Sequence, residues 1–399
     1  MSWETMKLSQ CCDSITDGDH LPPPKADSGV PFVTISNINA TNRFDFTNTM
    51  YVPQEYYDKL DSKRKARVGD VLYSVVGSFG IPVYIKSNKQ FVFQRHIAIL
   101  RPNEKIIPRF LYYTMLSRDF YAKADAVAIG AAQRTVSLTA LRNIEIEVPS
   151  IECQNKIVDI LSAYDNLIEN NQKQIKFLEE AAQRLYKEWF VDLHFPGYEN
   201  TEIIDGVPVG WKENTIDSKV KFLNGYAFKS KDFDENGTYK IVTIKNVKDG
   251  QFEGDNVNHI FDIPSKLPEH CKLVDGDILL SLTGNVGRVC LVTGKNYLLN
   301  QRVAKLKSDL PSYTYCLFRS HEMFVEMNNL ANGAAQQNLS PVKTGQIRMH
   351  FPTNELLNQF ESIIQPMIKK ILLLNKQNVE LTEARNRLLP KLMSGEIEV

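Results

Sequence analysis

The chain has little that would mark a membrane protein, a secreted protein or a metal-binding protein. No apolar run approaches the ~20 residues of a membrane-spanning helix. The polar start, from Met1 to Thr5, has no secretory leader pattern. Six scattered cysteines form no Cys-x-x-Cys pair. We therefore expect a soluble, cytoplasmic protein with reduced, mostly buried thiols and no metal site.

The motifs of several enzyme classes are also missing. There is no Gly-x-x-x-x-Gly-Lys-[Ser/Thr] loop for nucleotide phosphates and no His-Glu-x-x-His zinc motif. The Asn/Asp-Pro-Pro-aromatic tetrapeptide of amino-methyltransferases is absent too. The segments 77–80 and 284–287 lack the glycine spacing of a dinucleotide-binding turn and instead predict hairpin turns. We expect no catalytic residue and no cofactor in this chain.

Charge of neither sign dominates, because 47 Lys and Arg residues balance 47 Asp and Glu residues. A non-specific nucleic-acid binder is usually basic, so neutrality argues against one. A sequence-specific binder needs only a local basic face, and neutrality leaves that possibility open. With 399 residues and 43% hydrophobic content, the chain is suited to two or three globular domains.

What the chain does contain is an internal duplication. Five blocks recur in the same order, which predicts two units of one architecture. The paired blocks are 3–8 and 211–216, 29–38 and 238–247, 69–80 and 276–287, 94–95 and 301–302, and 130–137 and 333–340.

Each unit ends in a heptad pattern, over 157–190 and again over 360–393. Apolar residues at steps of four and three predict two long helices whose apolar seams are buried against each other. Asn171 and Asn378 interrupt the seams, and we expect them to control register. Pro366 predicts a kink or a restart of the second helix. The seam residues are Ile157, Leu161, Tyr164, Ile168, Ile175, Leu178, Leu185, Trp189, Phe360, Ile364, Met367, Ile371, Leu374, Leu381, Leu388 and Leu392.

The segments before the heptads are rich in strand patterns. Strands are predicted over 30–38, 70–76, 80–85, 91–100 and 144–148, and over 240–247, 277–282, 287–292, 297–306 and 347–351. Helices are predicted over 109–121 and 313–327. The fold class is therefore α+β, with two β-rich domains that are each followed by a long helix. The expected boundaries are 1–150, 151–194 for the first helix, 195–210 for a linker, 211–352, and 353–399 for the second helix.

Together these features resemble the specificity subunit of type I restriction–modification enzymes, over essentially the whole chain. The most specific pieces are 33–38 with 242–247, the two Gly-Asp-[Val/Ile]-Leu-x-Ser blocks, the Gly-Ala-Ala-Gln-x-x-x-Ser blocks, and the ending 388–397. The resemblance implies two target-recognition domains that read the halves of an asymmetric, split sequence in double-stranded DNA. It also implies that the long helices pair antiparallel as a coiled coil and act as the spacer between these domains.

The same resemblance implies partners. Two modification subunits would carry S-adenosylmethionine and methylate adenine, and restriction/translocase subunits would use ATP and Mg. A rival interpretation from the residues alone is a non-catalytic, two-module protein-interaction scaffold on a coiled coil, which the neutral charge favours.

Base contacts are expected where the two units differ, because domains that read different bases need not share their readers. Arg and Lys can pair with guanine edges and Asn and Gln with adenine, while other contacts only hold phosphates. Gln133 and Gln336 are shared, and we expect structural roles for them. The candidate DNA-binding residues are Asn37, Asn39, Asn42, Arg43, Ser78, Arg95, His96 and Arg134 in the first unit, and Lys245, Asn246, Lys248, Asn285, Arg288, Arg302 and Gln337 in the second.

Overall fold

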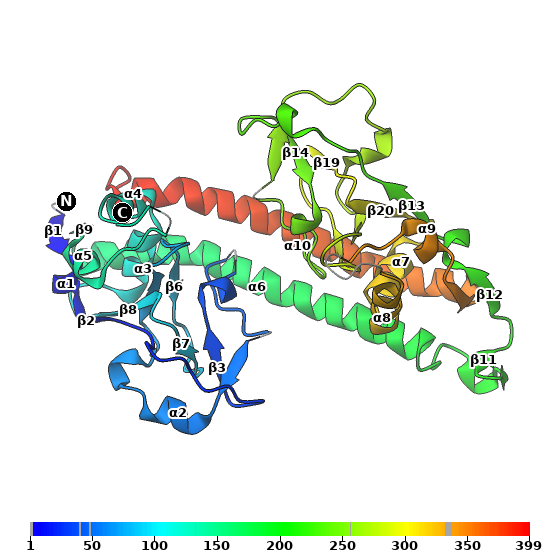
Figure 1. The fold of residues 1–399 in the computed structure, drawn as a ribbon, viewed down its shortest axis with the longest axis horizontal. Coiled ribbons are helices and arrows are strands. Elements are labelled where there is room, and N and C mark those ends of the chain that lie inside the picture. Colours follow the sequence, from blue (N-terminus) through cyan, green and yellow to red (C-terminus); the bar gives the residue numbers. More distant parts are fainter. Residues whose placement is uncertain (1–2, 40, 48, 132, 256, 332–336) are drawn as a thin grey trace. The chain divides into compact units, whose positions relative to one another are not determined.

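The computed structural model describes residues 3–39, 41–47, 49–131, 133–255, 257–331 and 337–399. Their contacts divide the chain into a first unit, Met1–Asn166 with Leu381–Val399, and a second unit, Leu167–Glu380. Each unit contains one β-rich module and one part of a pair of long helices (Figure 1).

The module of the first unit is built from small sheets. An antiparallel sheet has the spatial order β2 (Cys12–Asp17), β8 (Ile97–Pro102), β5 (Val71–Ser74) and β6 (Pro82–Tyr84). A three-stranded sheet has the order β4 (Met50–Val52), β3 (Val30–Val33) and β7 (Val92–Phe93), with β3 and β7 parallel. The strands β1 (Glu4–Lys7) and β9 (Glu145–Val148) pair beside them.

The module of the second unit repeats this topology. Its antiparallel sheet has the order β13 (Lys221–Asn224), β20 (Val303–Lys307), β17 (Ile278–Ser281) and β18 (Val289–Leu291). The other sheet has the order β15 (Asn258–Ile260), β14 (Tyr239–Val242), β19 (Tyr297–Leu299) and β16 (Lys272–Leu273), with β14 and β19 parallel. The strands β12 (Lys212–Thr215) and β21 (Arg348–Phe351) pair, and β10 (Ile203–Ile204) with β11 (Val207–Pro208) forms a small hairpin after the first long helix. The predicted duplication is therefore a duplication of sheet topology.

Three short helices also correspond between the units. The first module contains α1 (Leu8–Cys11), α2 (Gln54–Lys59), α3 (Pro108–Leu116), α4 (Arg118–Ala126) and α5 (Leu138–Asn143), and the second contains α7 (Pro311–Arg319), α8 (His321–Leu330) and α9 (Pro341–Gly345). The corresponding pairs are α3 with α7, α4 with α8 and α5 with α9. The long helices are α6 (Ile151–Phe190) and α10 (Asn354–Met393). Short 3-10 helices lie at Ile35–Asn37, Ser62–Arg64, Tyr198–Asn200, Ile216–Ser218, Ser230–Asp232, Ile244–Asn246 and Glu269–Cys271.

The first central strand of each module ends earlier than the apolar pattern predicts. In the first unit β3 stops at Val33, because Asn37 Oδ1 accepts hydrogen bonds from the Thr34 amide at 2.8 Å and the Thr34 hydroxyl at 3.1 Å. Asn246 binds Thr243 in the same way, at the same two distances. A side-chain acceptor thus replaces the neighbouring strand, and the backbone turns into a 3-10 helix.

Two other predicted elements are each divided in two. The segment 91–100 becomes β7 and β8 in different sheets, because a turn closed by the Ile97 amide on the Gln94 carbonyl at 3.1 Å redirects the chain. The segment 109–121 becomes α3 and α4, because the Ser117 hydroxyl accepts from the Phe120 amide at 3.2 Å and caps a new helix. The same divisions occur in the second unit, where Ser320 is the cap.

The hairpins that follow the Gly-Asp blocks are confirmed. The predicted return strands are β6, which pairs antiparallel with β5, and β18, which pairs antiparallel with β17.

The two long helices pack together in opposite directions, as predicted (Figure 1, α6 in green and α10 in orange and red). Within the second unit, Asn171 Nδ2 on α6 donates to Asn378 Oδ1 on α10 at 3.0 Å. Further along α6, the Trp189 ring lies 5.7 Å from the Phe360 ring, near the start of α10. Residue numbers rise on one helix as they fall on the other, which is an antiparallel pair.

The apolar residues predicted for the helix seams are all buried or half-buried. Many of them also contribute to the module cores. In the first unit, Ile157 and Leu161 of α6 share a core cluster with Leu392 of α10 and with the strands of the module. Each module is thus attached to its part of the helix pair by a continuous apolar core.

The restart that was one of the two outcomes predicted at Pro366 is wrong, because α10 continues as one helix from Asn354 to Met393, while the kink stays a prediction. Pro366 is exposed, so water can satisfy the backbone carbonyl that loses its helical partner.

All six cysteines are free and buried, as predicted. Burial raises the pKa of every one of these thiols, that of Cys11 to about 11. Among the described residues, no helix is long and apolar enough to cross a membrane.

Candidate nucleic-acid interface

A glycine-flanked hairpin turn is the centre of the candidate site in the first unit. The buried Ser74 hydroxyl donates to the Ser78 carbonyl and accepts from the Ile81 amide, both at 2.9 Å. Gly77 and Gly80 have φ of +70° and +95°, which few other residues adopt. The serine of the shared Gly-Asp-Val-Leu-x-Ser block therefore fixes the turn from inside and leaves Ser78 exposed at its tip.

The second unit builds the same turn with a different tip. The buried Ser281 hydroxyl donates to the Asn285 carbonyl and accepts from the Arg288 amide at 3.0 Å. Gly284 and Gly287 have φ of +71° and +79°. Asn285 replaces Ser78 as the exposed residue, so the scaffold is kept while the presented side chain differs.

Other candidate loops converge on the hairpin turn in the first unit. The Val75 amide donates to the His96 carbonyl at 2.9 Å, and the Gly77 amide donates to the Arg134 carbonyl at 2.9 Å. Arg95 and Arg134 are exposed and His96 is half-buried. Three separate segments are thereby brought together, and they carry four of the predicted contact residues, namely Ser78, Arg95, His96 and Arg134.

The same convergence occurs in the second unit. The Leu282 amide donates to the Arg302 carbonyl and the Gly284 amide donates to the Gln337 carbonyl, both at 3.0 Å. Arg302 and Gln337 are exposed and Arg288 is half-buried. The predicted block 333–336, which precedes Gln337, lies outside the described residues, as does residue 132 in the first unit.

Arg134 is partly engaged within its own loop. Its guanidinium forms an ion pair with the Asp125 carboxylate at 3.1 Å and donates to the Asp125 carbonyl, which closes the end of α4. The side chain remains 45% exposed. One face of the guanidinium can therefore still reach an anion or a base edge.

A second group of candidates lies in the turn after β3. Asn39 Oδ1 accepts from the Thr41 and Arg43 amides at 3.0 and 3.1 Å, and Asn42 has a φ of +55°. The side-chain oxygen of Asn37 likewise accepts a hydrogen bond from a backbone amide, that of Thr34. These asparagines therefore shape the turn through their side-chain oxygens.

In the corresponding turn of the second unit, the candidate residues differ in how far they are exposed. Asn246 is 2% exposed, and its amide nitrogen donates to the Glu253 carbonyl at 2.8 Å and to the Asp255 carbonyl at 3.4 Å. Its burial favours a structural role. Lys245 is exposed, and Lys248 forms an ion pair with Glu253 at 3.7 Å while remaining 39% exposed. The two lysines therefore keep their charge available at the surface.

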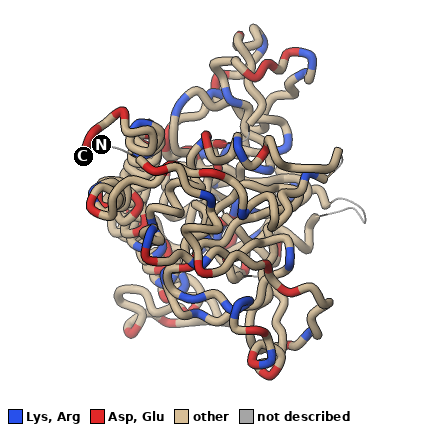
Figure 2. Tube along the Cα trace, turned by 90° about the vertical axis from the view of Figure 1, so that its left-hand side faces the viewer, with Lys and Arg blue, Asp and Glu red and all other residues tan. Residues whose placement is uncertain are grey.

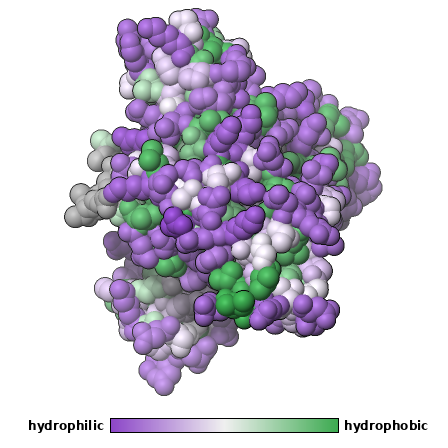
Figure 3. Space-filling view, turned by 90° about the vertical axis from the view of Figure 1, so that its right-hand side faces the viewer, coloured by the Kyte–Doolittle hydropathy of each residue, from purple (hydrophilic) through white to green (hydrophobic). Residues whose placement is uncertain are grey.

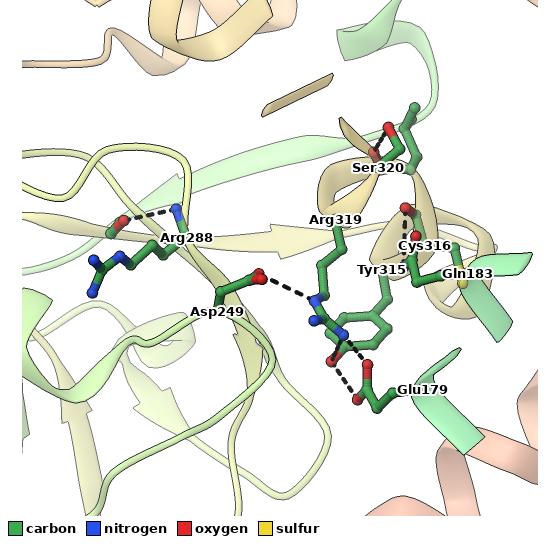
Figure 4. A network of polar contacts seen from close by, with 10 residues as sticks. Glu179, Gln183, Asp249, Arg288, Tyr315, Cys316, Arg319 and Ser320 are labelled. Carbon is green, nitrogen blue, oxygen red and sulfur yellow. Dashed lines mark hydrogen bonds and ion pairs between the residues drawn. The ribbon is translucent and has the colours of Figure 1, made fainter. Parts of the chain in front are cut away.

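A polar network that the sequence pattern did not suggest connects this turn to α6 (Figure 4). Arg319 of α7 donates to Glu179 of α6, to the Tyr315 hydroxyl at 3.2 Å and to Asp249 of the turn at 3.3 Å. The counterpart of Arg319 in the first unit, 203 residues earlier, is Leu116. Comparison of the two copies therefore did not predict this network. The only indication in the sequence was that the second copy has a charged residue where the first copy has leucine.

The two signs of charge are mixed over the molecule, which is not the distribution of a uniformly basic protein. Lys and Arg alternate with Asp and Glu along the trace (Figure 2). Among the described residues, no group of His, Cys, Asp and Glu has an arrangement that could hold a metal ion.

The surface in Figure 3 is mainly hydrophilic, with hydrophobic side chains in small groups. In the second unit, a hollow of about 920 Å³ is lined by residues such as Phe190, Met323 and Met349. Two acidic residues, Glu322 and Glu326, and two basic residues, Lys343 and Arg348, also line it, so its charge does not mark it as a phosphate site. We assign no DNA contact to this hollow.

The comparison with known families identifies the class of protein. The type I restriction modification DNA specificity domain matches the chain twice, over residues 1–180 and 208–383. The chain therefore belongs to this family, whose members are non-catalytic DNA-recognition components of type I restriction systems. The resemblance seen in the sequence is confirmed.

Individual relatives agree with this assignment. The type I restriction enzyme MjaIX specificity subunit of Methanocaldococcus jannaschii is 27% identical over 75% of this chain and 71% of its own length. The HindI specificity subunit of Haemophilus influenzae is 21% identical over 92% of this chain and 95% of its own. A crystal structure of a type I S subunit from M. genitalium shares the fold, with a TM-score of 0.53, 16% identity, and coverage of 98% of this chain and 96% of that one.

Proposed function

We propose that this specificity subunit reads a bipartite, asymmetric target in double-stranded DNA, one half with each module. The observation that carries the proposal is that the specificity domain occurs twice in one chain, around an antiparallel helix pair. We propose that the duplicated modules bind DNA as the two halves of a two-fold dimeric reader do. Because the exposed residues differ between the modules, the two half-sites are expected to differ.

The readers are proposed to be the converging loops of each module. In the first unit these are the loops with Ser78, Arg95, His96 and Arg134, together with the turn after β3 that holds Asn39, Asn42 and Arg43. In the second they are the loops with Asn285, Arg288, Arg302 and Gln337, together with the turn 248–251. The exposed Arg and Lys residues among them offer contacts to guanine edges and phosphates, and the exposed Asn and Gln residues offer contacts to adenine.

The long helices are proposed to be the spacer and the platform for partner subunits. A 40-residue helix is about 60 Å long, which is more than one turn of B-DNA. The partners are two modification subunits, which would supply S-adenosylmethionine and adenine methylation, and restriction/translocase subunits, which would use ATP and Mg. The proposed domains are 1–150 and 211–352 for recognition, 151–194 and 353–399 for the helices, and 195–210 for the linker.

The test is co-expression of the full chain with its modification subunit, followed by genome-wide mapping of methylated adenines. A split motif with two different halves and a fixed gap is expected. Methylation at an unsplit motif, or at no motif, would contradict the proposal. In that case a gel shift on duplex DNA would decide whether the chain is an interaction scaffold, which family membership does not favour.

A further inference from the structure

The polar network around Arg319 holds a candidate reading turn of the second unit against a long helix (Figure 4). The Arg319 side chain is 13% exposed and the Glu179 side chain is 12% exposed. Tyr315 completes the buried part, because its hydroxyl donates to Glu179 at 2.7 Å. Burial lowers the pKa of Arg319 to about 10, so the guanidinium is still charged at neutral pH. A buried, charged guanidinium needs these acceptors, which makes its position well defined.

The outer end of the network is the turn Lys248–Gln251, closed by the Lys248 amide on the Gln251 carbonyl at 3.0 Å. Asp249 in this turn is 69% exposed and accepts from Arg319 Nε. Gly250 has a φ of +70°, and a Cβ atom there would lie 2.6 Å from the guanidinium. The turn is therefore shaped to fit closely over Arg319.

The same turn also contacts the strand that begins after Arg288. The Gly250 amide donates to the Val289 carbonyl at 2.8 Å. In Figure 4 the Arg288 guanidinium lies on the side of Asp249 away from Arg319, and its charge partly offsets the burial that raises the pKa of Asp249. Lys248 and Arg288 are thus carried on neighbouring backbone segments, and the position of Lys248 depends on how the turn is held.

The first unit has a related arrangement, in which α6 again supplies a carboxylate. Tyr112 corresponds to Tyr315 of the second unit. Burial and, to a lesser extent, the charge of Asp165 on α6 raise the pKa of Tyr112 to about 12, although arginines that include Arg385 and Arg43 act to lower it. In this unit the turn after β3 supplies a cation, Arg43, whereas in the second unit the corresponding turn supplies an anion.

We propose that Arg319 is a positioning residue, which fixes the turn Lys248–Gln251 on helix α6 and so sets the base selection of the second module. The inference rests on the proposed function, since it assumes that the second module reads one half of a split target. It goes further in assigning specificity to a side chain that does not itself face DNA. The position of the turn Lys248–Gln251 is then determined by helix α6 as well as by the module.

Two substitutions separate the parts of the network. Asp249→Ala releases the turn and leaves the buried contacts of Arg319 with Glu179 and Tyr315 in place. Since the pair that it breaks is exposed on one side, base selectivity should fall by about two- to fivefold. Arg319→Met also leaves Glu179 buried without its cation, and selectivity should fall by about tenfold or more. Asp249→Glu keeps the carboxylate, so its selectivity should be closer to that of the wild-type protein than to that of Asp249→Ala.

The experiment maps methylated adenines in cells that express the full chain, or a variant, with the modification subunit. Asp249→Ala and Arg319→Met should admit further bases in one half of the motif, with the other half and the gap unchanged. Glu213→Ala is the matched control, because it removes an exposed ion pair with Arg348 at 2.7 Å elsewhere in the same unit. It should leave the motif as it is.

An unchanged motif with Asp249→Ala would overturn the inference, and so would equal loss of selectivity in both halves. If Arg319→Met forms no complex, Asp249→Ala decides the question, since it leaves the buried contacts intact. A wild-type protein without a split motif would instead overturn the proposed function, so the two failures are distinguishable.

Discussion

Asp165 joins a module helix to both long helices in the first unit, and its replacement should destabilise that unit strongly. Its carboxylate accepts from the Tyr113 hydroxyl at 2.6 Å and from Arg385 Nη1 at 2.7 Å. The Asp165 and Arg385 side chains are 11% and 16% exposed. Asp165→Leu leaves the half-buried Arg385 guanidinium without its carboxylate, with only the neutral Asn386 side chain as acceptor, and it leaves the buried Tyr113 hydroxyl without its acceptor. We expect a loss of about 3–5 kcal/mol in the free energy of unfolding of this unit.

A double substitution tests the physical reason for that loss. Asp165→Leu with Arg385→Met removes both charges together and replaces them by apolar side chains, which is often nearly neutral. Most of the lost stability should therefore return. Tyr113→Phe, which removes only one hydrogen bond, should cost about 1 kcal/mol.

The assay is a urea titration read by hydrogen exchange and mass spectrometry, which follows peptides of the two units separately. Asp165→Leu should lower the midpoint for peptides of the first unit only. If the single variant costs less than about 1 kcal/mol, the contacts are not a buried, mutually dependent set. If the double variant is as unstable as the single one, packing and not charge explains the loss.

Three further outcomes are expected. Asn171→Leu should cost about 1–3 kcal/mol in the second unit because it leaves Asn378 unpaired, while leucine at both positions should restore stability, as measured by the same urea titration. Buried thiols with raised pKa, such as that of Cys11, should resist a thiol reagent at pH 8 until urea unfolds the chain; rapid labelling of all six in the native protein would be inconsistent with their burial. Arg288→Ala and Arg134→Ala should each weaken specific DNA binding by about 1–3 kcal/mol in a gel shift with the modification subunit present, and unchanged binding in both would count against the loop assignment.

The architecture was predictable because it follows from patterns that repeat in the sequence. Heptads set the long helices, and ordered blocks set the duplication, since both patterns extend over many residues. The element ends were not predictable in the same way. At Thr34 and Ser117, single polar side chains bind nearby backbone groups and redirect the chain, an effect that apolar periodicity does not record.

The candidate site was predictable to the extent that it depends on loops next to shared strands. The sequence indicates which loops those are, and backbone hydrogen bonds bring them together. It does not indicate which of their side chains are already used. Asn246 is buried by contacts with a segment seven to nine residues away, and Arg319 depends on Glu179, which is 140 residues distant. Such pairings are fixed only by the tertiary fold.

The contacts that gather the reading loops suggest why one fold can serve two different half-sites. At the hairpin turns, the loops are joined through backbone groups, such as the amide of Gly77 and the carbonyl of Arg134. A backbone bond does not depend on the side chain, so the junction with the hairpin is kept where Gln337 takes the place of Arg134. The turn that carries Asp249 is different, because side chains hold it on the helix. We therefore expect readers at the hairpin to change independently, whereas this turn can change only together with Arg319.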